Sequence, residues 1–217
     1  MSEPLHILAI DTATGPCSAA VWAGGKVISY RENIKPTQQS ASLMPMVEEA
    51  LDAAGMGYGD ITRVACTTGP GSFTGIRVGL AAASGIAFAA GIEGAGFTSL
   101  EVLAFGALEQ AQGEPILVVL NAGKGEVYYQ AFASAPFTPL MAPSLGAVEL
   151  AAACVASPAL QCGNIPLLPG MMDAGIAFPR ADALAGLAAS MVSVLPLRPF
   201  YIRGPDAKLP AERVRIT

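Results

Sequence analysis

The chain has 217 residues, enough for one large domain or two small ones, and its 53% hydrophobic and 13% charged content predicts extensive burial. A net charge of −5 argues against an extended phosphate-binding surface, which needs clustered lysine and arginine. The longest nearly uncharged run, residues 78–92, is too short as a helix for a ~30 Å hydrocarbon core. Because no basic region precedes the first apolar run, we expect neither a signal peptide nor a membrane span, and a cytoplasmic location.

Histidine and cysteine usage limits the chemistry available to one chain. His6 is the only histidine and precedes a strand core, so we expect neither a Ser–His or Cys–His pair nor a two-histidine metal site within one chain. The four cysteines, Cys17, Cys66, Cys154 and Cys162, have no CxxC spacing. We therefore predict free thiols, no bound metal, and neither hydrolase chemistry of those kinds nor metallopeptidase activity.

The first third of the chain alternates strands and helices. Residues 5–11 are predicted to form a buried strand, and residues 18–22 and 26–31 a hairpin. A helix beginning at Ser40 or Ser42 and ending near Gly55 follows, with Pro45 in its first turn. Helical spacing places four apolar residues on one face of this helix: Met44, Val47, Leu51 and Ala54.

The next segment contains a glycine-rich loop and an apolar helix. Residues 61–68 are predicted to form a strand, followed by the loop "GPGSFTG", a helix over residues 76–90 and a short strand over 94–98. This helix has no polar face, and Gly79 and Gly85 would each destabilise its interior by roughly 1 kcal/mol relative to alanine. Close packing against a partner helix would offset that cost, so we expect a second polypeptide to cover it.

The second half repeats this pattern of strands and helices. Thr98 and Glu101 have capping-box spacing before a helix that ends at "QGEP", where we place a domain boundary. Strands over 116–120 and 126–133 and helices over 145–155 and 181–195 follow. The pattern predicts a duplicated α/β unit with mixed sheets, with domains at 1–112 and 113–217. A C-terminal tail that packs back on the first domain is an open alternative.

The glycine-rich loop raises the question of nucleotide binding. It matches neither GxxxxGK[ST] nor GxGxxG, so the loop is at most a weak nucleotide site, formed by Asp11, Thr12, Gly71 and Ser72. On this alternative the protein is an actin-like ATPase or a small-molecule kinase. On the structural alternative the glycines permit a tight turn, and Ser72 or Thr74 caps the following helix.

Several blocks of sequence together resemble the bacterial TsaB (YeaZ) family. They include "ILAIDTATGPCSAAVW", "SLMPMVEEALDAAG", "TTGPGSFTGIRVGLAAASGIAFAAG", "GKGEVYY" and "PFYIRGPDAK". The resemblance implies an actin-like, ribonuclease-H-type (ASKHA) fold of two domains with mixed sheets flanked by helices. It also implies a non-catalytic scaffold role in forming threonylcarbamoyladenosine beside the anticodon of tRNAs that read codons beginning with A.

The same resemblance implies partners. A TsaD-like catalytic subunit would pair with the two N-terminal helices through eight residues: Met44, Val47, Leu51, Ala54, Val78, Ala82, Gly85 and Ile86. A TsaE-like ATPase would join the complex, tRNA would bind through the complex, and the isolated chain would form a homodimer. No cofactor is expected in the isolated chain, whereas ATP or ADP would bind at the complex interface.

Three positions depart from the sequence pattern of the family. Asn121 and Gly123 replace an acid and a base common in relatives, and Gln39 stands where relatives often carry a histidine. These changes remove charge near the cleft between the domains.

The segment from residue 198 to the end has five basic and two acidic residues, including Arg198, Arg203 and Lys208. It is expected to be either a solvated arm or a contributor to tRNA binding.

Overall fold

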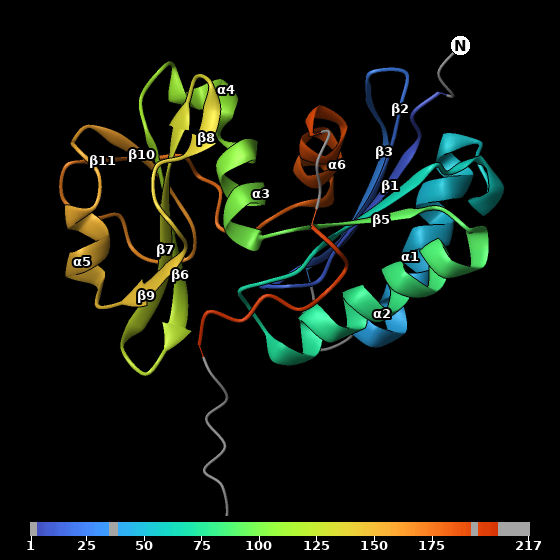
Figure 1. Cartoon of the computed structure of the whole chain (residues 1–217), viewed down its shortest axis with the longest axis horizontal. Coiled ribbons are helices and arrows are strands. Elements are labelled where there is room, and N and C mark those ends of the chain that lie inside the picture. The colour runs from blue at the N-terminus through green and yellow to red at the C-terminus, as the bar shows by residue number, and fades with distance from the viewer. Residues whose placement is uncertain (1–3, 35–38, 192–194, 204–217) are drawn as a thin grey trace, which may run out of the picture.

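The computed structural model describes residues 4–34, 39–191 and 195–203, and within them the chain forms two mixed β-sheets flanked by helices (Figure 1). The first sheet has the strand order β3-β2-β1-β4-β5. Its strands are β1 Ile7–Asp11, β2 Cys17–Ala23, β3 Lys26–Asn33, β4 Arg63–Thr67 and β5 Glu93–Phe97. The second sheet has the order β11-β10-β6-β7-β8, with β9 pairing with β7. Its strands are β6 Ile116–Gly123, β7 Glu126–Ser134, β8 Phe137–Pro139, β9 Ser144–Gly146, β10 Ala159–Cys162 and β11 Met171–Asp173.

The two sheets share one topology. In the first, β1, β2 and β3 form an antiparallel meander, and β4 and β5 continue the sheet in parallel from β1. In the second, β6, β7 and β8 form the meander, and β10 and β11 continue it in parallel from β6. The predicted duplicated α/β unit with mixed sheets is thereby confirmed, even though the sequence has no exact repeat.

Helices cover both faces of the first sheet. The helices of the described residues are α1 Gln39–Ala54, α2 Phe73–Ala90, α3 Ser99–Gly106, α4 Leu108–Ala111, α5 Val148–Ala153 and α6 Ala181–Ser190, with a 3-10 helix at Tyr58–Asp60. Leu8 and Ile10 of β1 pack in the core shared with α1 and α2, whereas Ile7 and Ala9 face the core that contains α6. Strand β1 is therefore apolar from Ile7 to Ile10, because both of its sides are covered.

Helix α3 lies between the two sheets (Figure 1). Leu100 and Leu103 pack with Ile116 and Val118 of β6, on one face of the second sheet. On the other face of that sheet, Leu117 and Val119 pack with Ala151 of α5. Both sheets are thus sandwiched between helices, and α3 connects the two cores.

Helix boundaries follow local capping chemistry. Ser72 accepts a hydrogen bond from the Gly75 amide and starts α2, three residues before the predicted start, which confirms Ser72 as the cap. The capping box of Thr98 and Glu101 is also confirmed at the start of α3.

Three predicted helices are shorter than expected. The helix predicted over "LEVLAFGALEQA", residues 100–111, is divided at Ala107 into α3 and α4. Of the helix predicted over 145–155, only α5 forms, because residues 144–146 pair with β7 as strand β9. The helix predicted over 181–195 ends at Ser190, after which Met191 has extended backbone angles.

Helix α6 and the segment after it return to the first sheet. Although α6 belongs to the range predicted for the second domain, Leu184 and Leu187 pack against β1 and β2. Leu195 then bridges to Gly96 of β5, and the Phe200 amide donates to the Thr68 carbonyl at 2.8 Å. Leu195 and Phe200 therefore contact the first sheet, Ile202 and Arg203 contact the second sheet, and residues 204–217 lie outside the described part of the chain. The domain boundary at residue 112 stays a prediction.

By length and composition alone, α2 is the single candidate membrane span among the described residues. Seven of its residues, including Ile76, Leu80 and Ala83, are buried in the protein's own structure. Arg77 near its start carries a charge. Packing on the first sheet therefore accounts for a large part of the hydropathy of this helix.

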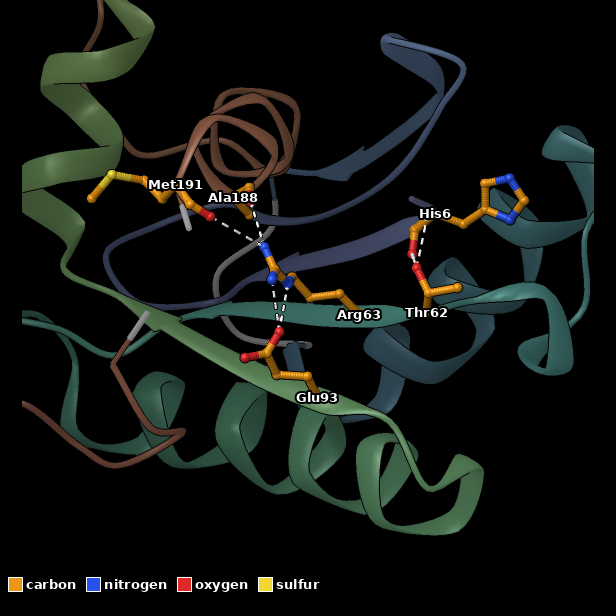
Figure 2. A network of polar contacts seen from close by, with 6 residues as sticks. All are labelled: His6, Thr62, Arg63, Glu93, Ala188 and Met191. Carbon is orange, nitrogen blue, oxygen red and sulfur yellow. Dashed lines mark hydrogen bonds and ion pairs between the residues drawn. The ribbon is translucent and has the colours of Figure 1, made fainter. Parts of the chain in front are cut away.

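Arg63 fastens the end of α6 to the first sheet (Figure 2). Its Nε donates to Glu93 on β5 at 2.9 Å, and a terminal nitrogen lies 2.7 Å from the same carboxylate oxygen. The other terminal nitrogen donates to the carbonyls of Ala188 at 2.9 Å and Met191 at 3.4 Å. A cation at a helix C-terminus satisfies carbonyls that have no partner within the helix. Arg63 thus joins β4, β5 and α6.

Replacing Arg63 with methionine is expected to lower the free energy of unfolding by about 2 kcal/mol, because the charged hydrogen bonds to α6 are lost. Urea denaturation measures this effect. The matched variant Glu93→Gln should cost less than about 1 kcal/mol, since Glu93 is half exposed and its ion pair is screened. If Arg63→Met were as stable as the wild type, Arg63 would not hold α6 in place.

Candidate functional site

An apolar groove lies between α1, α2 and the 3-10 helix. Its volume is about 710 Å³. It is lined by Met44, Glu48, Tyr58, Gly59, Ile61, Ala81, Ala82, Gly85, Ile86, Ala89, Ala90 and Ile92. Small side chains of α2 form one wall, so a partner could approach the helix backbone closely. Burial and the nearby Glu48 raise the pKa of Tyr58.

The outer side of α2 is uncovered in the described structure. Phe88 is 90% exposed, and Ala81, Ser84, Gly85 and Ala89 are exposed beside it. A side chain added at Gly85 would meet no atom within 4 Å. A fully exposed phenylalanine next to small apolar residues is an unfavourable surface in water and is typical of an interaction site.

The two helix glycines have different roles. At Gly79 an added Cβ would lie 2.4 Å from the Thr12 hydroxyl, so this glycine permits α2 to approach β1 within the same chain. The expectation that Gly79 serves packing against a partner is therefore wrong. Gly85 faces open space and remains available to a second polypeptide.

Two of the predicted interface residues are corrected by the structure. Val47 is 0% exposed and Leu51 is 3% exposed, and both pack in the core against the first sheet. The helical spacing of apolar residues in α1 identified an apolar face, but that face packs against the first sheet. Because they are buried within the chain, these two residues cannot contact a partner.

The other predicted interface residues lie at or near the groove. Met44, Ala82, Gly85 and Ile86 line it. Val78 and Ala54 are half-buried and pack against the core beneath the two helices. Their role in binding a partner stays a prediction.

Sequence reasoning missed several groove residues. Ala81 and Ala89 lie four residues on either side of Gly85, and this small-residue spacing was a signal that could have identified them. Tyr58 and Ile92 come from other elements and reach the groove only through the tertiary fold.

The four residues of the weak nucleotide-site prediction lie close together at the carboxyl ends of β1 and β4. The Ser72 amide donates to the Ala13 carbonyl at 2.6 Å. A Cβ on Gly71 would lie 2.2 Å from that carbonyl oxygen, so only glycine fits. The Thr12 hydroxyl donates to the Gly75 carbonyl at 2.7 Å. These contacts tie the two loops and the start of α2 together.

Asp11 is completely enclosed in this cluster. One carboxylate oxygen accepts hydrogen bonds from the Thr67 hydroxyl and the Ala13 amide, and the other has no hydrogen-bond partner among the described residues. Burial raises the pKa of Asp11 from 3.8 to about 7, although the Thr67 hydrogen bond opposes this shift. None of the three cavities described in the structure is lined by Asp11, Thr12, Gly71 or Ser72. Nucleotide binding there stays a prediction.

Among the described residues, neither the thiols nor a group of possible metal ligands forms a further candidate site. All four cysteines are free, and burial raises the pKa of Cys17 to about 11 and that of Cys162 to about 12. Within residues 4–34, 39–191 and 195–203, no three His, Cys, Asp or Glu side chains are grouped to hold a metal ion.

Comparison with known proteins identifies relatives of this chain. Residues 34–137 match the family described as TsaD, tRNA N6-adenosine threonylcarbamoyltransferase. The chain is 38% identical to the tRNA threonylcarbamoyladenosine biosynthesis protein TsaB of Escherichia coli K12 over 125 residues, which cover 58% of this chain and 54% of that protein. The match therefore spans about half the length of these curated TsaB relatives.

Longer matches extend over nearly the whole chain. An uncharacterized protein of Mycobacterium bovis is 32% identical over 207 residues, covering 93% of each chain. The solved structure of YeaZ from Pseudomonas aeruginosa is 26% identical, with a TM-score of 0.76, and covers 91% of this chain and 99% of that one. A second structure, of a protein from the same organism described as similar to peptidase YEAZ, has a TM-score of 0.78 and covers 92% of this chain. The chain is thus similar in sequence to TsaB proteins over 58% of its length, and its two-sheet architecture is similar to that of YeaZ over most of its length.

Proposed function

We propose that this protein takes part in threonylcarbamoyladenosine formation on tRNA as a non-catalytic scaffold subunit. The names of its TsaB relatives support this pathway. The observation that carries the scaffold role is the apolar groove between α1 and α2, continuous with the exposed outer side of α2. The partner that we assign to this surface is a TsaD-like catalytic subunit.

The match to the TsaD family supports this choice of partner. The matching residues 34–137 include both α1 and α2. A TsaD-like protein would therefore carry an equivalent pair of helices, and two similar pairs can pack against each other around an approximate two-fold axis. Small residues such as Ala81, Gly85 and Ala89 allow a closely packed crossing of helices.

The remaining parts of the assembly are also proposed from the family. A TsaE-like ATPase joins the two subunits in the cytoplasm, ATP or ADP binds where subunits meet, and tRNA binds to the complex. In the absence of TsaD, the same groove pairs with a second copy of this chain, because the exposed Phe88 and its apolar neighbours remain unfavourable in water.

The variant Gly85→Leu tests the proposal. We expect it to weaken binding to the TsaD-like subunit of the same organism by at least about tenfold, because a large side chain would obstruct close helix packing. The fold should be unaffected, since position 85 faces open space. Isothermal titration calorimetry measures the affinity, and sedimentation velocity measures self-association of the isolated chain.

Ala53→Leu is the matched control. It adds a side chain at an exposed position of α1 that does not line the groove, and it should leave the affinity unchanged. Equal affinities of Gly85→Leu and the wild type would show that the groove is not the binding surface. Failure of the wild-type chain to bind any TsaD-like subunit would overturn the scaffold proposal itself.

A further inference from the structure

Two exposed aromatic rings stack at the start of α2. Phe73, the first residue of α2, and Tyr201, in the C-terminal segment, have ring centroids 6.1 Å apart and an interplanar angle of 23°. The guanidinium carbon of Arg77 lies 3.7 Å from the centroid of the Phe73 ring. Phe73 is 58% exposed and Tyr201 is 47% exposed. The result is an aromatic pair with an associated cation, which we call the Phe73–Tyr201 platform.

Backbone and ionic contacts already hold the C-terminal segment beside the platform. The Phe200 amide donates to the Thr68 carbonyl, and Arg203 forms an ion pair with Glu126 of β7. Figure 1 shows this segment passing the start of α2 toward β6 and β7. Anchoring of the segment therefore does not depend on the Tyr201 ring alone, and half of that ring is left in water.

The platform lies on a different side of α2 from the groove. At 3.6 residues per turn, Phe73 and Arg77 are displaced by roughly 120° around the helix axis from the positions of Gly85 and Ala89. A partner seated in the groove and a ligand on the platform would therefore contact α2 from different directions.

Charge at the platform is opposite in sign to that of the whole chain. The net charge is −5, yet Arg77 lies on the platform and Arg198 belongs to the segment that carries Tyr201, whereas Arg203 is paired with Glu126. Flat rings beside arginine suit a ligand that has both π faces and phosphates. Unpaired nucleotides have both, and stacking of bases on exposed aromatic rings is a general mode of single-stranded RNA recognition.

We propose that the Phe73–Tyr201 platform stacks an unpaired RNA base, with Arg77 attracting the adjoining phosphate. The choice of RNA over other nucleic acids rests on the proposed function, whereas the stacking chemistry rests on the geometry. The platform would thus be the point at which this subunit contacts unpaired nucleotides of tRNA.

Binding of a short, fluorescently labelled single-stranded RNA to the purified chain at low salt tests this proposal. Tyr201→Ala should weaken binding by about tenfold, as loss of one base–ring stack does, whereas Tyr201→Phe should bind as the wild type. Arg77→Gln should reduce the slope of log affinity against log salt by about one. Thermal melting of each variant checks that it is folded.

The matched control is Phe88→Ala, which removes a more exposed ring from the same helix, roughly 22 Å away along its axis. It should leave RNA affinity unchanged. The proposal is overturned if the wild type does not bind the RNA, if Tyr201→Ala binds as well as the wild type, or if Phe88→Ala weakens binding equally. Because no TsaD-like subunit is present in this test, its outcome is independent of the Gly85→Leu result. Loss of affinity for that subunit, rather than for RNA, in Tyr201→Ala would instead make the platform a protein interface.

Discussion

Replacing Val47 with glutamate is expected to unfold the protein. Val47 is 0% exposed and packs in the core between α1 and the first sheet. A carboxylate there would be buried without a partner, and such a charge costs at least about 4 kcal/mol, which is a large part of the stability of a typical domain. Loss of the far-UV circular dichroism signal and of the cooperative thermal transition would measure this effect.

The neighbouring variant Met44→Glu is the contrasting control. Met44 is on the same helix but is 38% exposed and lines the groove. This variant should remain folded, with a stability within about 0.5 kcal/mol of the wild type, while its affinity for a TsaD-like subunit decreases. If Val47→Glu folded normally and lost only partner binding, the inward-facing position of Val47 would be contradicted.

Replacing Asp11 with asparagine is expected to remove a pH dependence from the stability of the protein. Burial raises the pKa of Asp11 from 3.8 to about 7, so the folded state retains this proton at pH values where the unfolded chain has lost it. Stability from this carboxyl group is therefore fully present below about pH 4 and decreases as the pH rises toward 7. The decrease amounts to roughly 4 kcal/mol at most.

Urea denaturation of the wild type and Asp11→Asn, from about pH 4 to about pH 8, separates this contribution from that of other groups. The difference between the two proteins in the free energy of unfolding should change with pH in the direction that favours the variant at higher pH. Thr67→Val should extend to higher pH the range over which stability decreases, because the hydroxyl that lowers the pKa of Asp11 is lost. Parallel pH profiles for wild type and Asp11→Asn would show that the carboxyl group is not perturbed by burial.

Much of the fold could be predicted from local signals. The buried strand β1, the hairpin of β2 and β3, the Ser72 cap of α2 and the capping box at Thr98 follow from the side-chain period and from hydrogen bonds between residues close in sequence. The repeated order of strands and helices indicated two similar sheets. The helix expected over 145–155 is shorter than predicted, because pairing of residues 144–146 with β7 depends on a strand that is not adjacent to them in the sequence.

The candidate site, too, could be predicted only where its features depend on local sequence. The sequence by itself determined that α2 is apolar on all sides, that small residues surround Gly85, and that the chain resembles TsaB, because these properties belong to the order of residues. Only the tertiary structure decided which apolar side is covered. It placed Val47 and Leu51 against the first sheet, left Gly85 and Phe88 exposed, and brought Tyr201 beside Phe73. The periodicity of a helix shows where its apolar face lies, but what covers that face depends on elements far away in the sequence.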